Sequence, residues 1–463
     1  MKKRKVFCLL SIFLIIIPSF SSAHDMILRN DGNYKRPTLN SLEDNNITLK
    51  THVVIAVIDS GINVYHEAFR RPNLTVDPSS YIDGFPNDTA AVNLTFTGNY
   101  TSNYEADKYI WEEQLKTHTL YWFPHTNVIG ISISQFLPTI LIFKEYPIID
   151  EFFHGTGVAS IIAKQNPNAT IVMIEAGADK LDEAFSWAVN QSWIDIITTE
   201  YAILYRPLIL FSSLRQWADL PAITKRGYDE GKIIIVPSGN RPWVNPMFSP
   251  LSGPPWVICV GGAEPFCHGA ALSATKNADY VSSFTQDAAF YESTTTYFSA
   301  SGTSFSVPSV AGTISNIIFS IRKEVNYTHG IINNTLIFIP EQDVHITNKD
   351  IRNAINHTAV YWKTTAWSLR DWIEQSPYVN ASDPYSGEPY TDFSMIFFRI
   401  TSLTLPINPI APWLQMGWGF VDNSIVNETV KVLLKKNAMP EKNSKAIQYM
   451  ENRYTLRKQR WGE

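Results

Sequence analysis

Cysteine is scarce in this sequence, with three residues among 463. Such a count does not fit a small scaffold held together by many disulfides. Cys8 lies in the N-terminal segment, so Cys259 and Cys267 remain for the rest of the chain. Their short separation fits a disulfide in an oxidising compartment, but Cys259 also lies in an apolar run and fits a buried thiol. The sequence leaves both states open.

Excess basic charge is also missing. The formal net charge is −5, and four basic residues lie together in the N-terminal segment, at residues 2–5. Removal of that segment would make the remaining chain more acidic still. The charge balance therefore argues against a nucleic-acid-binding protein.

Long hydrophobic runs are absent beyond the N-terminus. There, the basic residues 2–5 precede an apolar run from Val6 to Ile17 and the small residues Ser21-Ser22-Ala23. This pattern is typical of a cleavable export signal, and the run is shorter than the roughly 20 residues that a membrane span needs. The stretch from Ile131 to Ile149 comes closest elsewhere, but prolines and charges interrupt it. We predict a signal peptide at residues 1–23, a secreted, extracellular product and no membrane span in the mature chain.

Asn-X-Ser/Thr sequons are frequent. In an exported protein they would mark surface loops and carry glycans where the host attaches them. An Asn- and Thr-rich composition without sugar is the alternative. We expect a glycoprotein in a glycosylating host. The sequons begin at Asn46, Asn73, Asn87, Asn93, Asn99, Asn168, Asn190, Asn326, Asn333, Asn356, Asn380 and Asn427.

Three short segments place an acid, an imidazole and a hydroxyl in promising contexts. Asp59 follows the apolar run 53–58, which predicts a strand buried on both faces, as in a parallel sheet. His154 precedes glycines and the apolar run 158–163, which predicts a loop that enters a buried helix. Ser304 precedes Pro308, and proline is tolerated in the first turn of a helix. We therefore expect Ser304 at the positive end of a helix.

A fourth segment supplies an amide. The apolar run 233–236 predicts another buried strand, and it leads into Pro237-Ser238-Gly239-Asn240. An Asn side chain at such a strand end can donate to the oxyanion that forms when an acyl carbon becomes tetrahedral. The backbone N–H of Ser304 would be the second donor.

The four residues together match the needs of one reaction. A serine hydroxyl is a poor nucleophile until an imidazole takes its proton and a carboxylate fixes the imidazole tautomer. Each motif alone is a weak signal. Asp59, His154 and Ser304, in that order along the chain and with Asn240 between the last two, predict a hydrolase with an activated serine.

These segments resemble the subtilase (subtilisin-like) family of serine proteases, and the Ser motif is the most specific of them. The segment around Asn240 and the strand after it resemble the family's oxyanion region, and the segment 417–422 resembles the one that closes the domain. The Asp, His and Ser motifs are Asp59-Ser60-Gly61-Ile62 with His66, His154-Gly155-Thr156, and Gly302-Thr303-Ser304-Phe305-Ser306-Val307-Pro308.

The resemblance implies a fold and a mechanism. The fold would be α/β and doubly wound, with a mainly parallel sheet and helices on both faces. The activity would be peptide-bond hydrolysis through an acyl-enzyme, on a protein or peptide substrate. Asp59 would orient the general base His154, Ser304 would attack, and Asn240 would donate to the oxyanion. No cofactor is implied, and calcium, a frequent stabiliser in the family, has no ligands that we can assign.

Two departures limit what the resemblance implies. Gly157 stands where the family usually has a second His. Residues 198–202, Thr-Thr-Glu-Tyr-Ala, replace the Ser-Leu-Gly-like segment that pairs with the substrate. Specificity therefore does not transfer. Glu200 would favour a basic substrate side chain if it lines a subsite, and it has no role if it faces solvent, which is the interpretation we adopt.

The motifs run through most of the chain, so we expect one catalytic domain at residues 24–430. Insertions are expected at about 70–150 and 326–412, the second with Trp362, Trp367 and Trp372, and a charged tail at 431–463. About 30 residues precede the first strand after the signal, which leaves no room for a folded pro-domain. The oligomeric state is left open.

Two other functions were considered. An inactive subtilase-like domain whose insertions bind a partner would explain the altered strand 198–202 and the missing pro-domain, but decayed enzymes usually lose a triad member. An esterase or lipase would place the serine first, within Gly-X-Ser-X-Gly. Since Asp59, His154, Ser304 and Asn240 are all present, we predict an exported serine endopeptidase.

Overall fold

The structure is a computed structural model. It describes residues 52–133, 148–150, 154–202, 217–240, 246–263, 278–324, 337–339, 344–361 and 416–462. The expected signal peptide, Cys267 and the three tryptophans of the second expected insertion lie outside these residues.

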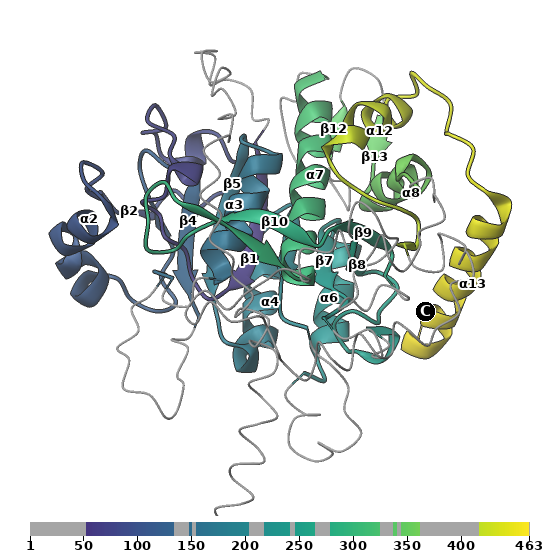
Figure 1. The fold of residues 1–463 in the computed structure, drawn as a ribbon, viewed down its shortest axis with the longest axis horizontal. Coiled ribbons are helices and arrows are strands. Elements are labelled where there is room, and N and C mark those ends of the chain that lie inside the picture. Colours follow the sequence, from purple (N-terminus) through teal and green to yellow (C-terminus); the bar gives the residue numbers. More distant parts are fainter. Residues whose placement is uncertain are drawn as a thin grey trace, which may run out of the picture.

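A nine-stranded sheet forms the centre of the molecule (Figure 1). All neighbouring strands are parallel except β3 and β4. The predicted α/β class with a mainly parallel sheet is therefore confirmed. The strand order is β2 (Ala90–Ala91), β3 (Tyr121–Trp122), β4 (Val128–Ser132), β5 (Ala169–Glu175), β1 (Val53–Asp59), β6 (Ile196–Thr199), β7 (Ile233–Pro237), β8 (Ile258–Ala263) and β9 (Tyr280–Ser283).

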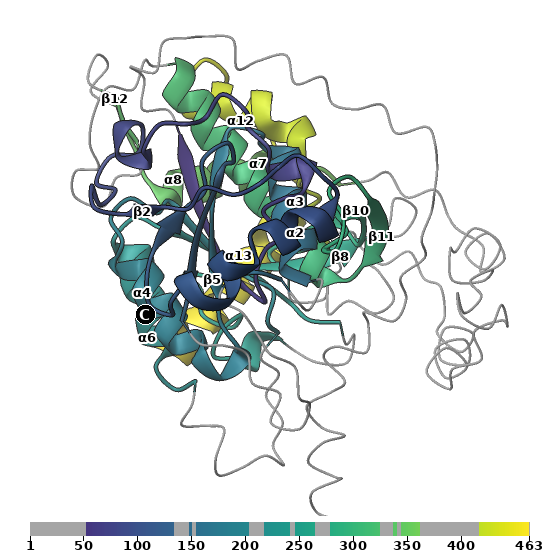
Figure 2. The same ribbon diagram turned by 90° about the vertical axis from the view of Figure 1, so that its left-hand side faces the viewer.

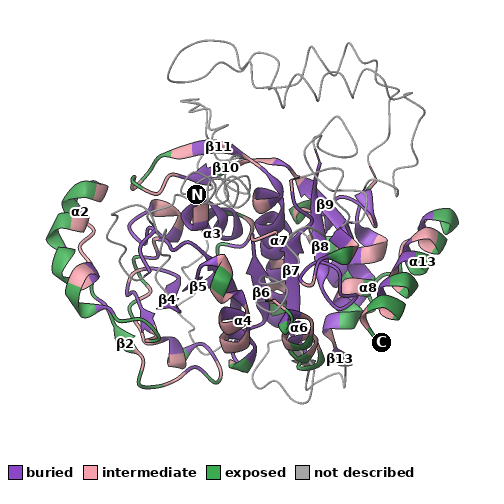
Figure 3. Ribbon diagram, turned by 90° about the horizontal axis from the view of Figure 1, so that it is seen from below, coloured by how far each residue is buried: buried purple, intermediate pink, exposed green. Residues whose placement is uncertain are grey.

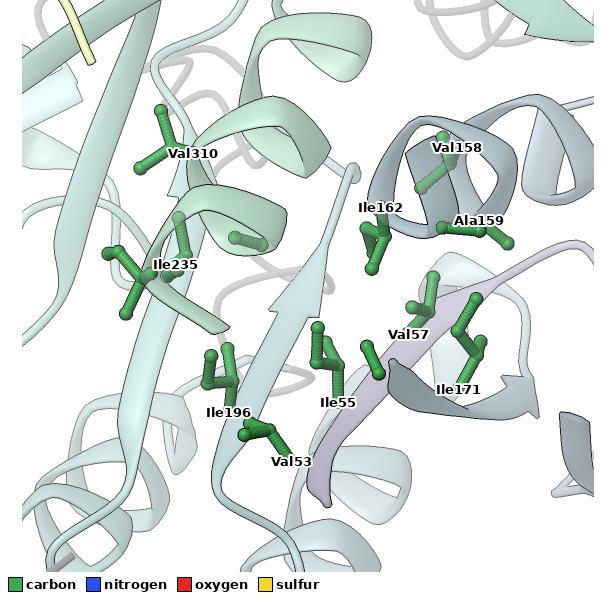
Figure 4. Close-up of a cluster of buried hydrophobic side chains, with 14 of the residues drawn as sticks. Val53, Ile55, Val57, Val158, Ala159, Ile162, Ile171, Ile196, Ile235 and Val310 are labelled. Atoms are coloured by element: carbon green, nitrogen blue, oxygen red, sulfur yellow. The ribbon is translucent and has the colours of Figure 1, made fainter. Parts of the chain in front are cut away.

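Helices cover both faces of this sheet, as predicted (Figure 2). On one face α3 (His154–Gln165) and α7 (Thr303–Glu324) share a core with Val53, Ile55 and Val57 of β1 (Figure 4). On the other face α4 (Leu181–Asn190) and α6 (Leu220–Asp229) share a core with the alternate residues of β1. Because successive strand residues point to opposite faces, the unbroken apolar run of β1 serves both cores.

The remaining elements surround this framework. Figure 3 shows the central strands buried and exposed residues along α2, α6 and α13. The remaining helices and hairpins are α2 (Tyr100–Ala106), the π-helix η5 (Ile110–Gln114), the hairpins β10 (Thr285–Ala289) with β11 (Tyr297–Ser301) and β12 (Ile337–Ile339) with β13 (Val344–Ile346), α8 (Asn348–Thr358), α12 (Val426–Leu433) and α13 (Ser444–Trp461). The 3-10 turns are η3 (Glu67–Phe69), η4 (Pro78–Ser80), η6 (Ala178–Lys180), η7 (Pro246–Phe248) and η9 (Asn423–Ile425).

The segment expected as a surface insertion at about 70–150 contributes to the core. It supplies strands β2, β3 and β4 at one edge of the sheet. Its Trp111 is fully buried and donates to the Tyr65 hydroxyl at 2.7 Å, which in turn donates to Asp107 at 2.9 Å. Part of this segment is therefore integral to the domain.

Helix α7 begins earlier than the position of its proline suggested. Thr303 is its first residue, so Ser304 lies in the first turn, as expected, while Pro308 lies in the second turn. Without an N–H on Pro308, the carbonyl of Ser304 loses its partner four residues on. By length and composition α7 is apolar enough to cross a membrane, but 78% of its most apolar stretch is buried in the protein.

Cys259 is a buried free thiol in β8. Burial, and next the charge of Asp279, raise the pKa of this thiol to about 12. Cys259 is therefore protonated at neutral pH and behaves as a small apolar side chain.

Candidate active site

The carboxyl end of β1 brings the predicted acid and imidazole together. Asp59 is the last residue of β1 and His154 is the first residue of α3. His154 Nδ1 lies 2.9 Å from Asp59 Oδ1 and 3.0 Å from Oδ2. The backbone N–H of Ser60 donates to Oδ1 at 2.7 Å. Asp59 is buried, while a fifth of the His154 side chain, 20%, is exposed. The contact fixes the proton on Nδ1 and leaves Nε2 to act as a base.

The surroundings of His154 make it a stronger base. Burial alone would lower the pKa of the imidazole, but the charge and the hydrogen bond of Asp59, together with the charge of Asp150, raise that pKa above 6.5. A histidine acts as a base only when it is neutral. Activity that depends on His154 must therefore rise as the pH rises through this elevated pKa.

Asp150 is a site residue that the sequence analysis missed. It is buried, and its Oδ2 accepts from the backbone N–H of Thr156, in the first turn of α3, at 2.8 Å. Its Oδ1 accepts from the Ser60 hydroxyl at 3.0 Å, and that hydroxyl accepts from Gly155 N–H at 3.0 Å. A carboxylate at a helix N-terminus is favourable. Asp150 thus connects the end of β1 to the start of α3.

The glycines of the Asp and His motifs allow this close approach. A Cβ on Gly155 would lie 2.2 Å from the carbonyl oxygen of Gly61, and Gly61 itself has φ +121°. A side chain at Gly155 would push α3 away from the end of β1, and one at Gly61 would lie 2.7 Å from the carbonyl oxygen of Ile148. The two glycines therefore have a physical role that the motif alone did not reveal.

The first turn of α7 carries the predicted nucleophile to the same end of the sheet. Ser304, the second residue of α7, is half-buried. The ring of the next residue, Phe305, lies 5.6 Å from the His154 ring, centroid to centroid. Ser304 and His154, both described, make no hydrogen bond to each other in this structure. Catalytic hydrogen bonds often tighten only in the complex with substrate.

The predicted oxyanion donor also faces the start of α7. Asn240 Oδ1 accepts from the backbone N–H of Thr303 at 2.8 Å and from its hydroxyl at 2.9 Å. Two donors identify this atom as the oxygen, and the amide N–H₂ group makes no hydrogen bond to the residues that the structure describes. A Cβ on Gly302 would lie 3.3 Å from Asn240 Nδ2. The Ser304 N–H has no acceptor among the described residues, so two donors are available near one point.

The expectation for Glu200 is wrong. Glu200 follows β6 and is only 5% exposed, so it does not face solvent.

No group of three or more His, Cys, Asp or Glu side chains within the described ranges is arranged to hold a metal ion. Calcium therefore stays unassigned.

No protein-family model and no curated protein matches the sequence. Solved structures do resemble it. A lanthipeptide protease has 13% identity and a TM-score of 0.44, over 84% of this chain and 90% of that one. The patellamide maturation protease PatG has 14% identity and a TM-score of 0.40, over 84% and 93%. A cold-adapted subtilisin-like serine proteinase has 16% identity and a TM-score of 0.35, over 60% and 79%. At these values the likeness concerns the fold, and the site rests on its own geometry.

Proposed function

We propose that this protein is a secreted subtilisin-like serine endopeptidase. The observation that carries the proposal is the contact of His154 Nδ1 with both oxygens of the buried Asp59, at 2.9 and 3.0 Å. This contact keeps the proton on Nδ1 and leaves Nε2 to act as the base. A carboxylate, an imidazole, a hydroxyl and an amide gather at the carboxyl end of the sheet, and these are the groups that acyl transfer by a serine requires.

Each group has a definite part in the reaction. His154 Nε2 takes the proton of the Ser304 hydroxyl as its oxygen bonds to the scissile carbonyl carbon. The carbonyl oxygen becomes an oxyanion and accepts from the Ser304 N–H and the Asn240 amide. The C–N bond then breaks, and the leaving amine receives the proton from His154. Water repeats these steps on the acyl-enzyme, which releases the acid and restores Ser304.

A fluorophosphonate probe tests this proposal directly. The protein without residues 1–23 is expected to be labelled on Ser304, and both Ser304→Ala and His154→Ala are expected to abolish labelling, because the hydroxyl is inert without its base. Ser301→Ala, in the preceding strand, is the matched control and should be labelled like the unmutated protein. Intact-protein mass spectrometry measures the adduct.

If the folded protein is not labelled by the probe, the proposal that it is an active enzyme is wrong. In that case the inactive, partner-binding domain becomes the better account of the chain.

Export follows from the N-terminal pattern. The sequons at Asn73, Asn87, Asn93, Asn99, Asn190 and Asn427 are exposed, whereas Asn356 accepts from the Tyr280 hydroxyl at 2.6 Å. Expressed in full in a eukaryotic secretory host, the chain should reach the medium with His24 at its N-terminus and lose mass with an N-glycosidase. Retention in the cell with Met1 in place would refute export, and Edman sequencing distinguishes the two results.

A further inference from the structure

Glu200 lies beside Asp59 in the sheet. Strands β1 and β6 are parallel, and Ile58 pairs with Thr199, so the next residues, Asp59 and Glu200, are neighbours in the same register. In-register residues of parallel strands point to the same face. Val57 and Ile196 belong to the core shared with α3 and α7, and by alternation Asp59 and Glu200 point to that face too. The two carboxyl groups are thus adjacent, on the side where His154 lies.

The Glu200 carboxyl group is buried without compensation. Neither of its oxygens has a hydrogen-bond partner among the described residues. Burial, and next the negative charge of Asp59, raise its pKa well above 4.5. The nearby Thr198 hydroxyl, which itself makes no hydrogen bond to a described residue, opposes this only in part. The group is therefore held as a neutral acid where a free glutamate would be ionised. Such a residue costs stability, and a buried polar group of this kind calls for an explanation.

The described elements around Glu200 supply no cation. From β1 the facing charge is Asp59, and from α3 the titratable group is His154. In β7 the residues nearest in register are Pro237 and Ser238, and α7 has no charged residue before Arg322. Within the described residues, Asp59 is the charged group that acts on the Glu200 carboxyl.

Asp59 has room for one more donor. Its Oδ1 accepts from Ser60 and His154, while Oδ2 accepts from His154 alone at 3.0 Å. A carboxylate oxygen can accept two hydrogen bonds. Two ionised carboxylates cannot hydrogen-bond to each other, because both are acceptors. With one proton on Glu200, its carboxyl group becomes a donor and Asp59 the acceptor.

We propose that Glu200 is a positioning residue of the Asp59–His154 pair, a neutral acid whose O–H donates to the Asp59 carboxylate and holds it against the imidazole. This role rests on the proposed function. It would explain why an acid, costly to bury, occupies this place in the strand.

Two substitutions of similar size separate this role from simple packing. Glu200→Gln keeps an N–H donor and is expected to retain kcat within about threefold. Glu200→Met removes the donor, and kcat is expected to fall by about 10- to 100-fold with KM nearly unchanged, the usual value of a hydrogen bond to a charged group. Thr170→Val is the control and should leave kcat unchanged, because this buried hydroxyl lies beside Val54, at the opposite end of the strands from Asp59.

Thermal unfolding shows that a loss of kcat is not a loss of fold. The folded-state pKa of Glu200 is raised. Its contribution to stability is therefore fully present when the pH is below 4.5, and it is lost as the pH rises toward the folded-state pKa. Both variants are therefore expected to be at least as stable as the unmutated protein at neutral pH. Their advantage should grow with pH.

Titration of His154 by NMR tests the inference without any need for activity. In the unmutated protein the His154 resonance should show two inflections, one from its own proton and one from Glu200, and in Glu200→Gln only the first. If the protein does not react with the fluorophosphonate but His154 shows both inflections, the proposed protease activity is wrong and the interaction of Glu200 with the Asp59–His154 pair stands. Full kcat in Glu200→Met, or a single inflection in the unmutated protein, would overturn the positioning role alone.

Discussion

Asp59→Asn is expected to lower kcat by about 10⁴-fold in a protein that stays folded. The amide matches the carboxylate in size. Because Oδ1 accepts from the Ser60 N–H, the amide nitrogen takes the Oδ2 position, where it cannot accept the hydrogen bond that His154 Nδ1 now makes at 3.0 Å. With Nδ1 facing a donor, the imidazole adopts the other tautomer and carries its proton on Nε2. The ring can then no longer accept the proton of Ser304.

The same change should alter the pH profile in a defined direction. The Asp59 charge and hydrogen bond raise the pKa of His154, so the Asn variant should reach its reduced plateau at lower pH than the unmutated protein. Steady-state kcat against pH measures both effects. Asp287→Asn, an exposed acid 3.8 Å from Lys164, is the control and should change neither. A kcat within tenfold of the unmutated value in Asp59→Asn would exclude Asp59 as the orienting acid.

The parts of the site that the sequence predicted are those in which chemistry and local structure coincide. Asp59 ends an apolar run, His154 precedes one, and Ser304 lies at the start of a helix, so each motif marks its own strand end or helix start. The parallel sheet then brings these ends to one edge. Little long-range information was needed to propose their meeting.

The parts that the sequence missed depend on partners far along the chain. Asp150 is linked to the end of β1 by the hydrogen bond that it accepts at 3.0 Å from the Ser60 hydroxyl, 90 residues earlier in the chain. The burial of Glu200 depends on the register of β6 against β1, and a shift of one residue would have turned its side chain to the other face. The strands β2 and β3 have two residues each and leave no periodic pattern.

The second large effect concerns the C-terminal helix. Asp279 is buried just before β9 and accepts from Arg453 at 2.9 Å and from Arg457 at 2.8 and 2.9 Å, both in α13. Arg352 of α8 lies 3.3 Å away, and the Cys259 N–H donates at 2.9 Å. Arg453 and Arg457 are four residues apart and share a helix face. This spacing alone does not predict that both bind Asp279, which lies 174 and 178 residues earlier in the chain.

Asp279→Asn is expected to lower the free energy of unfolding by about 3–5 kcal/mol, because it leaves buried guanidinium groups without their counter-charge. Arg457 would keep its bonds to the carbonyls of Gly253 at 2.8 Å and Val257 at 3.0 Å, but these carbonyls carry no net charge. Urea unfolding at neutral pH measures the loss. Asp229→Asn, which removes an exposed ion pair to Lys225 within α6, is the control and should cost at most about 0.5 kcal/mol.

The pH dependence of this effect distinguishes lost charge from lost packing. Burial alone would raise the pKa of Asp279, but the charges of Arg457, Arg352 and Arg453 hold it well below 3.8. A group with a depressed pKa contributes its stability above the unfolded value and loses it as the pH falls toward the folded one. The unmutated protein and Asp279→Asn should therefore converge in stability as the pH falls below about 4. A loss that persists undiminished in acid would mean that Asp279 holds α13 by shape rather than by charge.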